Sequence, residues 1–327
     1  MIRVARAGLL TTVQDAGRPG VQQHGIVMAG AMDAVAHGIA NVLVGNEPGA
    51  AALEATLLGP TLEFAADALV AVGGADLDAT VDDRAVPIWR PFLVARGSVL
   101  LLGRARTGCR AYVAVAGGID VPVVMGSRST DLIACIGGYE GRALAAGDTL
   151  PIGEMSETGT LIRDRIRASS RDARSAGRSL LPRYTSEPFV RVLRGPEHDR
   201  FTAASQLLMF KERFQVTAQS NRMGLRLTGP ALSLAGAYDL FSSPVAAGSI
   251  QVPPSGEPIV LMADHQTIGG YPRIANVITV DLPLLAQSPP GAFTRFREVG
   301  MAEAQSLYVA RERDLGIFAD SLRTYYS

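Results

Sequence analysis

The chain has 327 residues, of which 47% are hydrophobic and 19% charged, and its 31 basic residues balance its 31 acidic ones. This is the composition of an ordinary globular protein that is large enough for two domains with hydrophobic cores. A net charge of zero disfavours nucleic-acid binding, and arginines interrupt the longest apolar stretches, so no membrane-spanning segment is expected. The first residues lack the apolar run of a signal peptide, and we therefore expect a cytoplasmic protein.

The basic residues are almost all arginine, because Lys211 is the only lysine. Its surroundings fit neither a nucleotide-binding P-loop nor a biotin-carrying Met-Lys-Met segment. Cys109 and Cys135 are too few for a structural zinc site and are predicted to be reduced thiols of the core. The four histidines lack the spacing of a metal-binding motif, so no metal site is predicted.

In the first half, short runs of Val, Leu and Ile predict β-strands, among them residues 68–72, 98–102 and 112–116. One helix is predicted to begin at the N-cap residue Asp33 and to end at Gly45. Its polar stripe of Asp33, His37 and Asn41 is interpreted as a solvent-exposed face in preference to the lining of a cleft.

Residues 154–187 are rich in Ser, Arg and Gly and contain few apolar residues, which predicts a linker or a long mobile loop. We therefore place a first lobe at residues 1–150, a linker at 151–187 and a second lobe at 188–327. In the second lobe, residues 258–262 and 274–278 are predicted strands, and residues 301–314 are predicted to form a helix.

Three sequence pairs occur in the same order in both halves, which indicates an internal duplication. The pairs are Arg3-Val4-Ala5-Arg6 with Arg191-Val192-Leu193-Arg194, Gly59-Pro60 with Gly229-Pro230, and Asp120-Val121-Pro122 with Asp281-Leu282-Pro283. Because each copy is rich in short strands separated by turn residues, the sequence predicts a mainly β protein of two barrel-like lobes.

Residues 263–272 separate two predicted strands and contain Asp264, His265, Gln266 and Thr267, followed by Gly269 and Gly270. Polar groups crowded at a strand end are typical of a functional site. The same pattern also fits a surface hairpin in which the glycines only provide a turn.

Further polar clusters lie at residues 13–20, 30–33 and 220–224. Together with residues 263–272 they provide carboxylates, an imidazole, guanidinium groups and amides, which suit binding a carboxylate and polarising a carbonyl or an amide. There is no GxSxG motif, which argues against a serine hydrolase, and the glycines near residue 73 do not fit GxGxxG.

These clusters carry a resemblance to the biotin-dependent carboxyltransferase family, also called the allophanate hydrolase subunit 2 family. The matching residues span the chain: Gln14-Asp15, Gly17-Arg18-Pro19-Gly20, Gly30-Ala31-Met32-Asp33, Leu53-Glu54, Gly59-Pro60, Arg222-Met223-Gly224, Ile250-Gln251-Val252-Pro253, Asp264-His265-Gln266-Thr267 and Gly269-Gly270-Tyr271-Pro272. The resemblance implies two cyclophilin-like β-barrel lobes.

The resemblance also implies a function, and the branch that fits best is a subunit of an ATP-dependent 5-oxoprolinase, which opens 5-oxo-L-proline to L-glutamate. Its expected partners are 5-oxoprolinase subunits A and B, with ATP used through the complex and no biotin attached to this chain. Two alternatives stay open. One is a non-catalytic antagonist of a histidine-kinase inhibitor, and the other is the carboxyltransferase part of a urea-carboxylase-like enzyme with an external biotin carrier.

By this resemblance the lactam is expected in a cleft between the lobes, with Arg18 or Arg222 binding its carboxylate and Gln266 or Asn221 contacting its ring carbonyl. Asp264 and His265 are the expected bases. The complete set of predicted site residues is Asp264, His265 and Asp15 as catalytic residues, and Gln14, Arg18, Asn221, Arg222, Gln266, Thr267, Gly269 and Tyr271 as substrate-binding residues. The chain departs from the family where Asn221 replaces an aspartate, Leu225 a tyrosine, Ile268 a threonine and Ala29 a serine.

Overall fold

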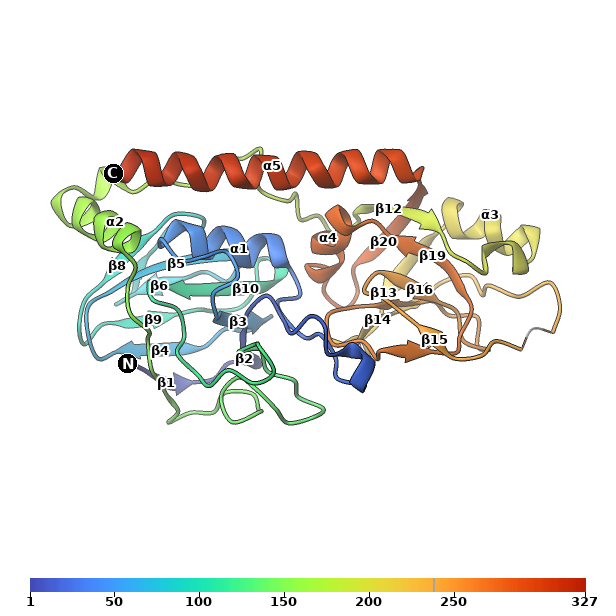
Figure 1. Ribbon diagram of the computed structural model, residues 1–327, viewed down its shortest axis with the longest axis horizontal. Coiled ribbons are helices and arrows are strands. Elements are labelled where there is room, and N and C mark those ends of the chain that lie inside the picture. Colours follow the sequence, from blue (N-terminus) through green and yellow to red (C-terminus); the bar gives the residue numbers. More distant parts are fainter. Residues whose placement is uncertain (238) are drawn as a thin grey trace. The chain divides into compact units, whose positions relative to one another are not determined.

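The computed structural model describes residues 1–237 and 239–327 and shows a mainly β protein (Figure 1). The chain divides into two compact units. Unit 1 consists of Met1–Arg18, Ala29–Pro182 and Glu312–Ser327, and unit 2 of Pro19–Met28 and Arg183–Arg311. The segment Pro19–Met28 thus belongs to unit 2 although residues of unit 1 flank it on both sides, and the C-terminal segment Glu312–Ser327 belongs to unit 1.

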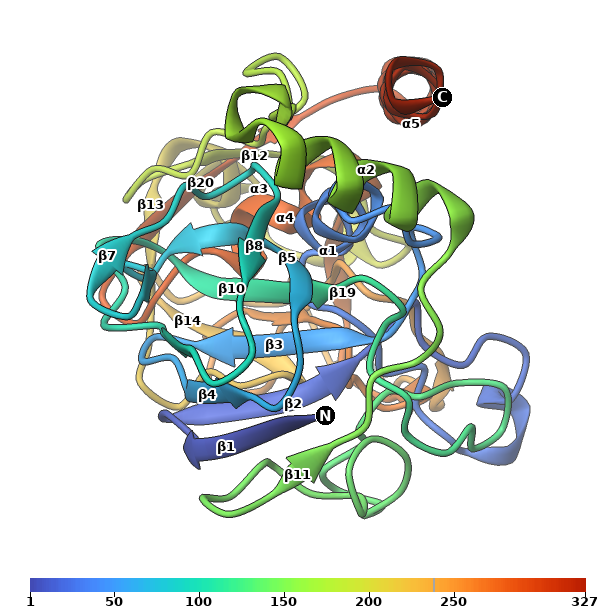
Figure 2. The same ribbon diagram turned by 90° about the vertical axis from the view of Figure 1, so that its left-hand side faces the viewer.

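Unit 1 contains two sheets in which every pairing is antiparallel (Figure 2). One has the order β11 (Thr149–Leu150), β1 (Ile2–Arg6), β4 (Thr61–Phe64), β9 (Val99–Leu101), β6 (Thr80–Val81) and β7 (Arg84–Ala85). The other has the order β2 (Leu10–Gln14), β3 (Ala52–Thr56), β10 (Thr107–Val115), β5 (Ala68–Asp76) and β8 (Phe92–Val94). Their apolar side chains form one core, and the three strands predicted in this half are confirmed as β5, β9 and β10.

Helix α1 (Ala34–Leu43) packs on β5 and β10 (Figure 2). Those two strands are apolar almost throughout because both of their faces are covered. Gly73 in β5 allows this approach, since a Cβ there would lie 3.0 Å from the carbonyl oxygen of Ala36 in α1. The helix is confirmed, with Asp33 as its N-cap accepting a hydrogen bond from the Ala36 amide at 2.9 Å.

The expectation of a solvent-exposed polar stripe on α1 is wrong. Asp33, His37 and Asn41 are at most 2% exposed. Their polar groups are satisfied locally instead: a ring nitrogen of His37 contacts the carbonyl oxygen of Gln14 at 3.2 Å, and Asn41 donates to the carbonyl oxygen of Ala50 at 2.9 Å.

Residues 154–187, predicted to form a linker or a mobile loop, contain helical structure. Helix α2 (Glu157–Ala168) occupies its first part, with Ser156 as N-cap and with Ile162 and Ile166 buried, and η2 (Ser170–Asp172) follows. The two isoleucines are four residues apart, so a single apolar stripe suffices to dock the helix although its other faces are rich in arginine. Residues up to Pro182 belong to unit 1.

Unit 2 is built on a closed barrel. Its strand order is β12 (Phe189–Arg194), β19 (Arg273–Val277), β16 (Ser249–Gln251), β17 (Ile259–Leu261), β14 (Gly224–Thr228), β13 (Arg213–Val216) and β20 (Phe293–Glu298), and the parallel pair of β12 and β20 closes it. The strands predicted at 258–262 and 274–278 are confirmed as β17 and β19. Smaller elements are β15 (Ser243–Pro244), β18 (Ile268–Gly269), α3 (Ala203–Lys211), α4 (Leu282–Ala286), η1 (Gln22–His24), η3 (His198–Arg200) and η4 (Thr279–Asp281).

The C-terminal helix α5 runs from Met301 to Tyr326, well beyond the predicted end at residue 314 (Figure 1). Its last part belongs to unit 1, where the hydroxyl of the buried Tyr326 accepts from the amide of Arg174 and donates to the carbonyl of Asp172, both at 2.9 Å. No helix in the part of the chain that the structure describes is long and apolar enough to cross a membrane.

The two cysteines differ in environment. Cys109 is buried in β10, as predicted, and burial raises the pKa of its thiol. Cys135 is exposed, so the expectation of a second core thiol is wrong. It lies in an irregular segment at a φ of 55°, where the backbone turns away from the sheets.

Candidate functional site

In unit 1, the end of β2 leads into a buried carboxylate with four neutral hydrogen-bond donors. Asp15 Oδ1 accepts from the amide of Gly17 at 2.8 Å and from the hydroxyls of Ser127 and Ser129 at 2.6 and 2.5 Å, and Oδ2 accepts from the amide of Arg128 at 2.5 Å. These contacts join two segments more than 110 residues apart in the sequence. Asp15 therefore holds the 127–129 loop against the end of β2. Asp15 and these donors, with Gln14, Arg18 and Thr130, are called the Asp15 cluster below.

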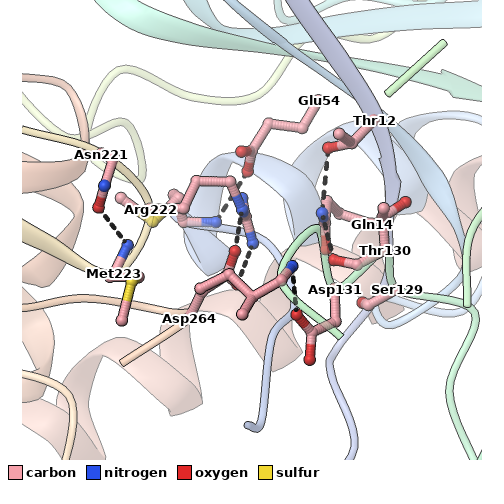
Figure 3. Close-up of polar contacts among 12 residues, drawn as sticks. Thr12, Gln14, Glu54, Ser129, Thr130, Asp131, Asn221, Arg222, Met223 and Asp264 are labelled. Atoms are coloured by element: carbon pink, nitrogen blue, oxygen red, sulfur yellow. Dashed lines mark hydrogen bonds and ion pairs between the residues drawn. The ribbon is translucent and has the colours of Figure 1, made fainter. Parts of the chain in front are cut away.

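Two side chains of this cluster keep buried polar atoms without a hydrogen-bond partner among the described residues. Arg18 is completely buried and donates from Nη2 to the carbonyl oxygen of Ser129, while its Nε and Nη1 have no such partner. Gln14, also completely buried, donates from Nε2 to Thr12 Oγ1 at 3.0 Å and to the Thr130 carbonyl at 3.2 Å, while its Oε1 has none (Figure 3). Such atoms are rare in folded proteins and call for an explanation.

A second buried network in unit 1 connects β3, β10 and the start of α1. Glu54 Oε2 accepts from the amide of Met32 and from the hydroxyl of Tyr112, and that hydroxyl accepts from the amide of Asp33, all at 2.8 Å. Burial, followed by the nearby charge of Glu54, raises the pKa of Tyr112 well above its ordinary value, so Tyr112 stays protonated and donates. The only sequence signal for Glu54 is its place in the family pattern, as a carboxylate in an otherwise apolar strand.

In unit 2, Arg222 and Asp264 form a buried two-point ion pair. The Nε and Nη2 atoms of Arg222 lie 2.8 Å from the two carboxylate oxygens of Asp264, and both residues are at most 4% exposed (Figure 3). The backbone adds to this pairing, because the amide of Asp264 donates to the carbonyl of Arg222 at 3.0 Å. Asp264 is thus a fixed counter-charge.

His265 follows this pair in a buried position, 7% exposed. Its Nδ1 lies 2.6 Å from the carbonyl oxygen of Gln266, a distance that requires the proton on Nδ1 and leaves Nε2 as the acceptor of the neutral ring. Burial lowers the pKa of His265, and the Gln266 carbonyl and the charge of Asp264 only partly oppose this. The neutral imidazole is therefore the group with base character in this segment.

Gln251 is a buried residue of unit 2 that was not among the predicted site residues. Its Oε1 accepts from Gln266 Nε2 at 3.3 Å, and its Nε2 has no hydrogen-bond partner in the described part of the chain. A Cβ on Gly269 would collide with that nitrogen, so glycine at 269 leaves room for the amide of Gln251. The signal for Gln251 in the sequence is its place in the family pattern.

The other predicted residues of unit 2 are less enclosed. Asn221 is exposed, and its side-chain oxygen accepts from the amide of Met223 at 2.8 Å (Figure 3). It also accepts from the amide of Gly224 at 3.3 Å, so Asn221 has a turn-forming role. Thr267 is half-buried and Tyr271 is 45% exposed.

A cavity of about 470 Å³ lies in unit 1, lined by residues of the 120–124 and 135–141 loops and by Pro151. None of the predicted site residues lines it. Within residues 1–237 and 239–327, no group of three or more His, Cys, Asp or Glu side chains is arranged to hold a metal ion.

Comparison with known proteins identifies a family and several relatives of this chain. The family model of the carboxyltransferase domain, subdomain A and B, matches residues 24–298. The C subunit of the 5-oxoprolinase of Escherichia coli (strain K12) is 46% identical over 305 residues, which cover 93% of each chain. The urea amidolyase of Saccharomyces cerevisiae is 33% identical over 322 residues, which cover 94% of this chain but only 17% of the length of the amidolyase. The crystal structure of Kluyveromyces lactis urea carboxylase matches 97% of this chain and 29% of its own, with a TM-score of 0.87 and 30% identity.

Proposed function

The chain belongs to the family of carboxyltransferase domains with subdomains A and B, and from this membership we propose that it is a subunit of an ATP-dependent 5-oxoprolinase that converts 5-oxo-L-proline to L-glutamate. The observation that carries the proposal is the 46% identity to the C subunit of a 5-oxoprolinase over 93% of both chains. In contrast, the chain spans only 17% of the yeast urea amidolyase.

The reaction needs three contributions. ATP phosphorylates the ring carbonyl oxygen of the lactam and leaves as ADP, water attacks that carbon, and the ring C–N bond breaks to give glutamate and phosphate. Because Lys211 is the only lysine and lies in no P-loop, we assign ATP binding to the complex with subunits A and B. No step is assigned to biotin on this chain.

Within unit 2, His265 is the proposed base for the attacking water, since its neutral ring presents Nε2 as an acceptor. Asp264 is a positioning residue, because both of its carboxylate oxygens are held by Arg222. The side-chain N–H groups of Gln251 and Gln266 are proposed hydrogen-bond donors of this unit, and Asn221, Thr267, Gly269 and Tyr271 are proposed to shape the segments around them.

Within unit 1, Arg18 and Gln14 are the proposed substrate-binding residues. Asp15 is expected to act through the loop that it holds, since its four neutral donors fix it in place.

The direct test is reconstitution. The chain is purified with subunits A and B, and release of ADP and glutamate from 5-oxo-L-proline is measured with His265→Gln and, as a matched control, with Glu298→Gln at an exposed ion pair. We expect turnover in the wild-type complex, a loss of roughly 10²- to 10⁴-fold in His265→Gln and none in the control. Absence of turnover in every combination of subunits would overturn the proposal.

A second function is favoured by one observation, the similarity to urea amidolyase and urea carboxylase. In that case the chain transfers a carboxyl group from an external biotin carrier to urea or a related amide. Avidin distinguishes the two functions, because it blocks biotin-dependent carboxylation and leaves cleavage of 5-oxoproline unaffected.

A further inference from the structure

Arg18 is a fully buried cation without a paired carboxylate in the described part of the chain. Of the ion pairs found among the described residues none includes Arg18, and its only hydrogen bond there goes to the neutral carbonyl of Ser129. An uncompensated buried charge destabilises a folded chain strongly, and native proteins retain one where it serves a purpose.

The guanidinium group of Arg18 retains a complete two-donor edge. Four of the five N–H groups of an arginine lie on two such edges, and a single hydrogen bond from Nη2 uses one of them. The second hydrogen of Nη2 remains, together with a hydrogen of either Nε or Nη1 on the same edge. This is the geometry with which arginine binds a carboxylate at two points.

Gln14 provides the complementary group close by. Its amide nitrogen binds the carbonyl of Thr130, and Arg18 binds the carbonyl of the preceding residue, Ser129. Adjacent residues have Cα atoms only about 3.8 Å apart, so the two side chains meet the same short stretch of backbone. Gln14 Oε1 is a buried acceptor without a donor among the described residues, and Arg18 has a buried donor edge without an acceptor there.

We propose that Arg18 and Gln14 together form a recognition site for a carboxylate that lies next to an amide N–H. In this site, which rests on the proposed function, the carboxylate of 5-oxo-L-proline binds the free edge of Arg18 and its ring N–H donates to Gln14 Oε1. The site selects cyclic α-amido acids over simple lactams, because a lactam without a carboxylate leaves Arg18 without its counter-charge. We assign the carboxylate to Arg18 and not to Arg222, because Asp264 already balances the charge of Arg222.

Glycine at position 137 is part of the same site. A Cβ on Gly137 would lie 2.6 Å from Arg18 Nη2 and would also collide with the carbonyl oxygen of Ser129, and its φ of 66° is unfavourable for other residues. Glycine at position 137 therefore leaves the room that the guanidinium group of Arg18 occupies.

The test uses three ligands without ATP, on the full chain and on its complex with subunits A and B. The ligands are 5-oxo-L-proline, 2-pyrrolidinone, which lacks the carboxylate, and 5-oxotetrahydrofuran-2-carboxylate, in which a ring oxygen replaces the N–H. Calorimetric titration gives the affinities for the wild type, Arg18→Met, Gln14→Met and the control Arg3→Met, which alters an exposed ion pair of unit 1.

We expect the wild type and Arg3→Met to prefer 5-oxo-L-proline to 2-pyrrolidinone by roughly 10- to 100-fold, the value of a charge-assisted hydrogen bond, and to the lactone by roughly 10-fold, the value of a neutral one. Arg18→Met should abolish the preference over 2-pyrrolidinone, and Gln14→Met the preference over the lactone. Because these are ratios within one variant, partial destabilisation of a variant does not imitate them.

Unchanged ratios in both variants overturn the site, as does a wild-type chain and complex that bind none of the three ligands. The outcome is separate from that of the proposed function. Turnover by the wild-type complex with unchanged ratios removes the site and keeps the function, whereas the expected ratios without turnover keep the site and remove the function.

Discussion

The two units each contain a buried arginine from the family pattern, and the two arginines differ in the partner that each one binds. In unit 2, Arg222 holds both carboxylate oxygens of Asp264 at 2.8 Å. In unit 1, Arg18 is more deeply buried than Arg222 and, among the described residues, binds a neutral carbonyl only. The nearest analogue of Asp264 in unit 1 is Asp15, whose oxygens are occupied by backbone amides and serine hydroxyls instead.

The difference shows how one residue type serves stability in one place and binding in another. An internal ion pair stabilises its surroundings only while both partners are present, so Arg222 belongs to the scaffold that presents His265. Arg18 has no such carboxylate among the described residues, which is the basis for proposing that it receives an anion.

The largest effect is expected from breaking the pair of unit 2. Asp264→Asn removes the carboxylate that binds the buried Arg222 at two points and should lower the free energy of unfolding by about 3 to 5 kcal/mol. Urea denaturation followed by circular dichroism measures it. Glu298→Gln, at the exposed two-point pair with Arg194, is the control and should cost below about 1 kcal/mol. Equal costs for the two variants would remove the distinction between a scaffold pair and a surface pair.

The next effect is expected where Gly137 leaves room for the side chain of Arg18. Gly137→Ala forces a Cβ against Arg18 and the Ser129 carbonyl at a positive φ, and we expect a loss of about 2 to 3 kcal/mol together with the loss of 5-oxo-L-proline binding. Gly126→Ala is matched to it, since its φ is 80° and nothing lies within 4 Å of the added Cβ. That control should cost only about 1 kcal/mol and keep binding. Thermal unfolding and titration of both variants show whether the contact with Arg18 matters beyond the backbone strain.

Asp15→Asn examines the carboxylate that holds Ser129, the residue whose carbonyl oxygen accepts from Arg18. The amide keeps the shape but replaces one acceptor by a donor, which faces either the Arg128 amide or the Gly17 and serine donors. We expect a loss of about 2 kcal/mol in the free energy of unfolding and weaker 5-oxo-L-proline binding through the displaced 127–129 loop. A stable variant with intact binding would show that the loop does not depend on this carboxylate.

The smallest effect is a pH dependence beside the Arg222 pair. Burial lowers the pKa of His265 below its ordinary value of 6.5, so the unfolded chain binds this proton more readily than the folded one. The stabilisation from the neutral ring is complete above about pH 6.5 and is lost as the pH falls through the lower pKa of the folded state. The drop in the urea midpoint between pH 7.5 and 5.5 should be smaller in His265→Gln and unchanged in the control His24→Gln, at an exposed position. An identical drop in wild type and His265→Gln would contradict a buried neutral imidazole.

The sequence predicts those parts of the fold that depend on neighbours along the chain. The strands β5, β10, β17 and β19 and the start of α1 at Asp33 follow from local patterns. Local patterns do not show what covers a polar stripe, and they therefore do not reveal the burial of His37 and Asn41. Helix α2 escapes prediction for a related reason, because two buried isoleucines are hidden among arginines.

The candidate site shows the same limit. The family pattern identifies Gln14, Arg18, Arg222 and Asp264, but not which arginine has a carboxylate partner. The serines that hold Asp15 lie more than 110 residues away along the chain, and nothing in their own sequence distinguishes them. Only the folded chain separates the paired arginine from the other one.

The most direct measurement is the free energy of unfolding of Arg18→Met in the absence of ligand, compared with that of the wild type. Methionine matches the apolar stem of arginine and removes the charge. If Arg18 is kept for an anionic ligand, its removal relieves an uncompensated buried charge, and the variant should be as stable as the wild type or more stable. A loss of about 3 kcal/mol or more, like that expected of Asp264→Asn, would show that Arg18 is a structural cation and contradict the account.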